Sequence, residues 1–237
     1  MLDVHPPHSP SHTWKDFFIH VGTICVGLLI AVGLEQSVEA IHRHRQREEL
    51  LAALSGETQQ ILLDSQRVEI AITQRKVWAK QCESQISTAV SKHQPSASLP
   101  TLHADDFDVP DDPIYSAAKA SGKLELLSDE EARAYGELDK LTLKLERYYL
   151  LQADDASKLS NDRQGLAFGL PEGAEPLTRA TPQQLGELYA DLISYEKSKD
   201  NFQYWERETR GAASALASGE RNLRTIESAE RQFDKLP

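Results

Sequence analysis

The stretch FFIHVGTICVGLLIAVGL, residues 17–34, decides the fold because it is a nearly unbroken apolar run. Eleven of its 18 residues are Phe, Ile, Val or Leu, and at about 0.45 kcal/mol each they favour membrane insertion by roughly 5 kcal/mol. As an α-helix, 18 residues rise about 27 Å, close to the hydrocarbon thickness of a bilayer. The run predicts a transmembrane helix, with Trp14, Phe17 and Phe18 as an aromatic belt at its first end.

A cleaved signal peptide is the main alternative, and the flanking residues argue against it. Signal peptides combine a basic leader, a shorter apolar stretch and a small-x-small cleavage site. The leader MLDVHPPHSPSHTWKD, residues 1–16, has one lysine, and Glu35 and Gln36 follow the run directly. Ala31 and Gly33 do form a small-x-small pair, so this alternative stays open.

On the two sides of the run the sequence predicts a disordered tail, residues 1–16, and a helical body, residues 35–237. No proline interrupts residues 17–94, and apolar residues recur there at helical spacing. This pattern predicts that the transmembrane helix continues into one long helix to about Ser91. The stripe consists of Leu50, Leu54, Ile61, Val68, Ile72, Ala79, Cys82, Ile86 and Ala89.

The rest of the body reads as further helices around a Pro- and Asp-rich loop, residues 92–113. A short helix is expected over residues 114–120. Capping boxes at Ser128 and Thr181 predict two more long helices, one to about Leu159 and one whose stripe extends to Phe233. No segment shows sustained period-two alternation, so the predicted fold is all-α, an elongated antiparallel helical bundle.

The charge distribution limits the partners of the chain. With a net charge of −11 and a pI near 5.2, nucleic acid is not an expected partner, because its binding needs a clustered basic surface. Arg43, Arg45 and Arg47 follow the run, whereas Lys15 alone precedes it. The single apolar run predicts a single-pass inner-membrane protein. By the positive-inside rule the charge bias favours a cytoplasmic body, although long domains also cross membranes regardless of charge.

Three groups of residues have the composition of metal sites. Glu39 and His42 match one Glu-x-x-His motif, but a di-iron bundle needs two, so a helix surface at the headgroup level is the better interpretation. An acidic loop lacks the Gly and Glu of an EF-hand, and the tail histidines have no fixed geometry. The loop residues are Asp105, Asp106, Asp108, Asp111 and Asp112, and the tail residues are His5, His8 and His12. We expect no metal and no cofactor.

One face of the apolar run is built for close helix packing. Thr23, Gly27, Ala31 and Glu35 recur every four residues and so share one side of the helix. Small-x-x-x-small faces let two membrane helices approach closely, although small residues are also simply common in membrane helices. We therefore expect a homo-oligomer or a membrane-protein partner. The stripe from Leu54 through Ile61 to Val68 either continues this contact against a twin helix or packs inside its own bundle.

Two stretches resemble a known group of sequences. They are GLLIAVGLEQSVEAIHRHRQREEL, residues 27–50, and SAAKASGKLELLSDEEARAYGELD, residues 116–139. Both resemble bacterial single-pass membrane proteins that are classed as domains of unknown function. The resemblance covers about a third of the chain and implies a membrane-tethered helical domain without an assigned activity.

No catalytic motif is readable, since the chain has no phosphate-binding Gly-x4-Gly-Lys, no Gly-x-Ser-x-Gly and no His-Glu-x-x-His. The sequence thus favours a non-enzymatic, membrane-anchored module for protein interaction or sensing. The alternative is an enzyme or a ligand-binding sensor with a pocket between the helices near Tyr148 and Trp205. A pocket with converging polar groups would favour this alternative, and a filled core with an exposed apolar stripe would favour the interaction module.

Overall fold

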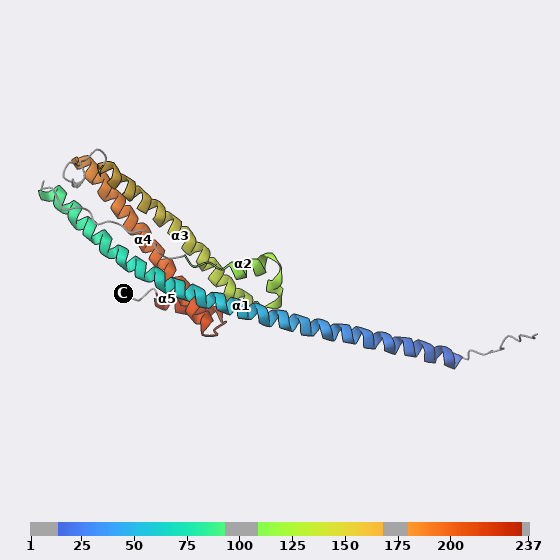
Figure 1. The fold of residues 1–237 in the computed structure, drawn as a ribbon. Coiled ribbons are helices and arrows are strands. Elements are labelled where there is room, and N and C mark those ends of the chain that lie inside the picture. Colours follow the sequence, from blue (N-terminus) through green and yellow to red (C-terminus); the bar gives the residue numbers. More distant parts are fainter. Residues whose placement is uncertain (1–13, 93–108, 168–179, 234–237) are drawn as a thin grey trace, which may run out of the picture. The chain divides into compact units, whose positions relative to one another are not determined.

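In the computed structural model, residues 14–92, 109–167 and 180–233 are described, and within these ranges the chain is all-α, as predicted (Figure 1). The predicted tail, apart from residues 14–16, and most of the predicted acidic loop lie outside these ranges. The chain divides into two compact units, residues 1–49 and 50–237. The helices are α1 (Trp14–Lys92), α2 (Pro113–Ala120), the 3-10 helix η1 (Lys123–Leu126), α3 (Asp129–Ala167), α4 (Pro182–Ala217) and α5 (Leu223–Phe233).

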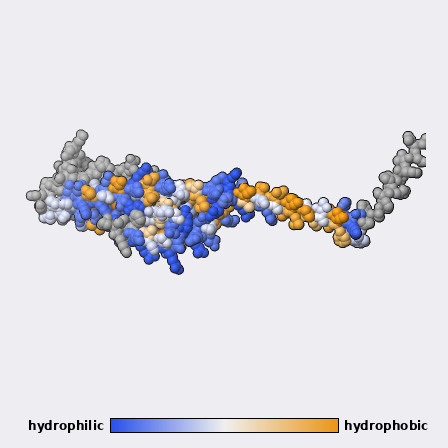
Figure 2. Space-filling view, turned by 90° about the horizontal axis from the view of Figure 1, so that it is seen from below, coloured by the Kyte–Doolittle hydropathy of each residue, from blue (hydrophilic) through white to orange (hydrophobic). Residues whose placement is uncertain are grey.

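In the first unit, the apolar run of α1 is exposed along its whole length. Its most apolar 18 residues have a mean hydropathy of 2.3, and none of them is buried. Figure 2 shows this run as a band of orange atoms. By length and composition it is able to cross a membrane, and a signal sequence near the N-terminus would show the same properties. Trp14 and Phe17, which precede and begin the run, stand edge to face with ring centroids 5.9 Å apart.

The second unit is a bundle of α3, α4 and the part of α1 that follows Glu49. Its core has three apolar clusters, and each contains residues from all three helices. Residue numbers rise from cluster to cluster along α1 and α3 and fall along α4, so α4 is antiparallel to both (Figure 1). Representative members are Leu54, Leu138 and Ala213 in the first cluster, Val68, Leu145 and Phe202 in the second, and Ile86, Leu159 and Leu188 in the third.

The predicted stripe of α1 belongs to this core. Leu54, Ile61 and Val68 are at most 1% exposed and pack against the other helices of the same bundle. Burial of these side chains is therefore achieved within one chain, because α3 and α4 cover them. The hypothesis that this stripe pairs with a twin helix is wrong, and the alternative, packing inside its own bundle, is confirmed.

Both predicted capping boxes are present. The backbone N–H of Ser128 donates to Glu131 Oε2 at 2.8 Å, and the N–H of Glu131 donates to Ser128 Oγ at 3.3 Å. Thr181 and Gln184 make the same reciprocal pair at the start of α4. Each box satisfies donors that the first helical turn leaves without partners. The start of α3 is as predicted, and the helix extends past the expected Leu159 to Ala167, since no Gly or Pro lies between Gly136 and Gly165.

The predicted long helix from Thr181 to Phe233 is wrong, because it is two helices, α4 and α5. The break is a Schellman motif, in which Gly219 N–H donates to the Leu216 carbonyl and Glu220 N–H to the Ala215 carbonyl, both at 3.0 Å. Gly219 has φ 93°, which favours glycine. Asn222 then starts α5 by accepting the N–H of Arg224 on its side chain. The turn lets Ile226 of α5 join the core beside Leu216.

Candidate functional site

The predicted association face lies open in the first unit. Thr23, Gly27, Ala31 and Glu35 are all exposed. A Cβ added to Gly27 would meet nothing within 4 Å among the described residues. The hydroxyl of Thr23 donates to the Ile19 carbonyl at 2.8 Å, so this polar group is satisfied within its own helix. The face remains a prediction, and it is accessible to a partner helix.

The Glu-x-x-His residues are engaged in pairs on the surface of α1. Glu39 forms an ion pair with Arg43 at 3.0 Å, and His42 Nε2 lies 2.9 Å from Gln46 Nε2. Within the described residues no group of three or more His, Cys, Asp or Glu side chains could hold a metal ion together. His5, His8, His12, Asp105, Asp106 and Asp108 lie outside those residues.

The place of the predicted pocket near Tyr148 and Trp205 is occupied by side chains. The two rings stack with centroids 5.8 Å apart, and Lys144 Nζ lies 4.1 Å from the centroid of Trp205. Tyr204 covers Trp205 edge to face at 5.0 Å. Tyr148 and Trp205 pack against the side of the second apolar cluster.

A cluster of charged side chains, most of them buried, connects α4 to α1. Glu206 is fully buried, and Arg210 Nε lies 3.5 Å from Glu206 Oε1. Arg210 also bonds to Glu69 of α1. Burial raises the pKa of Glu206 to about 7, although Arg210 works against the shift. The hydrogen bond from Arg210 lowers the pKa of Glu69. Arg210 therefore contacts two carboxylates, Arg207 lowers the pKa of both as a further positive charge, and the inner carboxylate titrates near neutrality.

A second polar layer lies nearer the end of α1. Gln152 and Tyr195 are fully buried, and Trp78 stands edge to face on Tyr195 at 5.6 Å. Arg75 is 7% exposed, and burial lowers its pKa while Tyr195 and Tyr149 raise it. Polar groups inside a helical bundle limit the registers in which its helices can pack.

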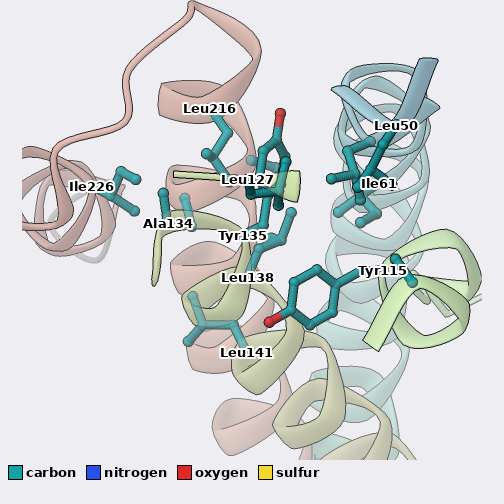
Figure 3. Close-up of a cluster of buried hydrophobic side chains, with 14 residues drawn as sticks. Leu50, Ile61, Tyr115, Leu127, Ala134, Tyr135, Leu138, Leu141, Leu216 and Ile226 are labelled. Carbon is teal, nitrogen blue, oxygen red and sulfur yellow. The ribbon is translucent and has the colours of Figure 1, made fainter. Parts of the chain in front are cut away.

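At the opposite end of the bundle, α2 is fastened to α1 and α3. The carboxylate of Glu57 accepts the backbone N–H groups of Ile114 and of Tyr115, the latter at 3.1 Å. These are donors of the first turn of α2, so a residue of α1 caps this helix. Tyr115 reaches from α2 toward Leu138 and Leu141 (Figure 3). A Cβ on Gly136 would lie 3.0 Å from the Tyr115 hydroxyl, so glycine permits this approach.

Carboxylates outnumber cations in this corner. Asp112 is 7% exposed, and its pKa is raised to about 7 by burial, by Asp139 and by Glu57. Lys119 pairs with Asp139 at 2.9 Å. The corner thus holds one lysine and the three carboxyl groups of Glu57, Asp112 and Asp139, and the Asp112 side chain is mostly buried.

The outer face of α1 in the second unit carries a separate apolar stripe. Leu63, Ile70 and Val77 are 51%, 61% and 55% exposed, and they recur at seven-residue spacing. The spacing of this row is visible in the sequence, but spacing alone does not show which of the two rows of α1 faces the bundle. It is the exposed apolar stripe that favours an interaction module over an enzyme.

No family model, no curated protein and no solved structure matches this chain. The resemblance to bacterial single-pass membrane proteins therefore remains a prediction from the two stretches that carry it. The described structure defines an all-α class with one helix apolar enough to span a membrane.

Proposed function

We propose that the chain is a membrane-anchored, non-enzymatic helical module for protein interaction or sensing, held at the inner membrane by residues 17–34. The observation that carries this proposal is the fully exposed apolar run of α1. An unburied run of this length would aggregate in water and is stable in a bilayer. The charge bias around the run favours a cytoplasmic body.

The interaction role is supported by how the second unit uses its side chains. Its interior is filled by three apolar clusters and the polar groups between them. Leu63, Ile70 and Val77 remain on the surface. A filled core with an exposed row at heptad spacing is what a helix that contacts another protein requires.

Membrane fractionation tests the anchor. The full chain with a C-terminal tag is expected to stay in the membrane pellet after an alkaline carbonate wash and to keep its original N-terminus. The reason is that residues 17–34 insert with a free-energy gain of roughly 5 kcal/mol. A soluble product that begins near residue 34 or 35 would show that the run is a cleaved signal and would overturn the proposal.

Self-association of the anchor is tested by Gly27→Ile, which adds bulk at the centre of the small face. If Thr23, Gly27 and Ala31 form the contact, dimers trapped by crosslinking in native membranes should fall about tenfold, equivalent to about 1.4 kcal/mol. Gly22→Ile is the matched control, because it adds the same bulk on a neighbouring side of the helix and also meets nothing within 4 Å. An equal dimer yield from both variants and from the unsubstituted chain would remove this face from the proposal.

A further inference from the structure

A surface depression of about 360 Å³ lies beside the corner where α2 meets α3. Asp112 lines it together with Asp111 and Glu146, and no lysine, arginine or histidine is among the described residues that line it. Ser116 and Thr142 add hydroxyl groups, and Leu143, which is 54% exposed, forms part of an apolar wall. The volume is near the lower end of the range for small-ligand pockets.

The Asp112 side chain is what distinguishes this depression from an ordinary acidic surface. It is 7% exposed, and its Oδ2 makes no hydrogen bond of normal geometry within the described residues. A carboxylate oxygen in this position lacks the partner that buried polar atoms ordinarily have. Asp112 therefore lines the depression with a buried carboxyl group, one oxygen of which has no donor among the described residues.

The groups around Asp112 make its surroundings electronegative. Glu57 of α1 and Asp139 of α3 both raise its pKa, and Asp111 adds to this effect. Lys119 of α2 is held by Asp139 at 2.9 Å, and the hydroxyl of Thr142 donates to the backbone carbonyl of Asp139 at 2.9 Å. A positive charge that entered the depression would relieve the repulsion among these carboxyl groups.

We propose that this depression binds a small organic cation, a primary alkylammonium, with Asp112 as its counter-ion. An ammonium group has three N–H donors. Asp112 would accept one of them, and the rim carboxylates Asp111 and Glu146 and the two hydroxyls offer acceptors for the other two. An alkyl chain matches the apolar wall at Leu143. A metal ion is a poorer match, because the described residues contain no group of three side chains that could hold one.

Binding of a cation and protonation of Asp112 exclude each other. The ammonium is bound by the carboxylate form, so at pH 7 its binding releases the proton from the roughly half of the molecules in which Asp112 is protonated. The ammonium therefore replaces a proton in a site where one neutralising charge is favourable. This coupling gives a readout that a nonspecific contact on an acidic surface would not produce.

Titration calorimetry on the full chain in detergent tests the proposal with n-butylammonium chloride as the probe. We expect saturable binding at one site, with heats at pH 7 that vary with the ionisation enthalpy of the buffer. Asp112→Asn is expected to weaken the affinity at least tenfold, because it removes the counter-ion, and to keep the helical content, because burial already favours the neutral form of this carboxyl. Asp154→Asn, an exposed position elsewhere on α3, is the matched control and should bind as the unsubstituted chain does.

Several results would overturn the proposal. They are the absence of saturable binding at 50 mM n-butylammonium, equal affinity in Asp112→Asn, and equal binding of the neutral analogue n-butanol. Tighter binding of calcium chloride would assign the depression to a divalent cation instead. Binding of oligolysine in the absence of any n-butylammonium binding would indicate a side chain of a protein partner.

Discussion

Arg210→Met is expected to destabilise the bundle by about 3–5 kcal/mol at pH 8, because it leaves the fully buried Glu206 without its nearest cation. Methionine preserves most of the packing volume, so the loss reports the charge rather than a cavity. Chemical denaturation of the full chain in detergent, followed by the far-ultraviolet helix signal, measures the change.

The loss should depend on pH in a defined direction. The pKa of Glu206 in the folded chain is raised to about 7 from its usual 4.5. Its stabilising contribution is therefore complete below about pH 4.5 and is lost as the pH rises through 7. Without Arg210 the ionised form of Glu206 is still less stable in the interior. The destabilisation by Arg210→Met should therefore be largest at pH 8 and should decrease toward pH 5.5. At that pH the remaining cost is the lost contact with Glu69.

The double variant Arg210→Met with Glu206→Leu separates the charge from other effects. It removes both buried charges, and Glu69 is 39% exposed and can be solvated. Apolar replacement of a buried ion pair is often neutral or stabilising. The double variant should thus recover to within about 1 kcal/mol of the original chain. A double variant as unstable as Arg210→Met would show that the arginine acts through contacts other than Glu206.

Phe202→Ala is expected to cost about 3–5 kcal/mol, because it empties the centre of the second apolar cluster. Phe202 is fully buried, packs with Val68, Ile72 and Leu145, and lies with its ring 5.7 Å from that of Tyr149. In a unit of this size the loss corresponds to roughly 10 °C in the melting temperature.

The control for Phe202→Ala is Tyr189→Ala, another aromatic residue of α4. Tyr189 is 39% exposed, and its replacement should change the stability by less than about 1 kcal/mol. Thermal melts of both variants in the same detergent allow the comparison. Equal losses in the two variants would mean that the three clusters do not hold α1, α3 and α4 together as the packing indicates.

The helical class and the main helix starts could be predicted from the sequence because their causes are local. The exposed run of α1 is apolar in itself, and the boxes at Ser128 and Thr181 are closed by residues three positions away. The break between α4 and α5 is local too, since Gly219 marks it. It was missed because apolar residues keep their helical spacing through the turn, and this spacing outweighed a single glycine.

The charged interior could not be predicted from the sequence, because its members come from distant parts of the chain. Arg210 meets Glu69, and Glu57 caps a helix that starts at Pro113, contacts that depend on how α1, α2 and α4 pack. Burial of Glu206 and Asp112 depends on the same packing, and burial is what moves their pKa values toward 7.

By itself the sequence determined that this protein is helical, that one run is apolar enough for a membrane, and where most helices begin. Hydropathy, spacing and capping act over a few residues, so the chain carries this information along its length. Only the tertiary structure decided that the stripe of Leu54, Ile61 and Val68 is internal and that Leu63, Ile70 and Val77 stay on the surface. Both rows have helical spacing, and which one is buried depends on the side of α1 that α3 and α4 cover.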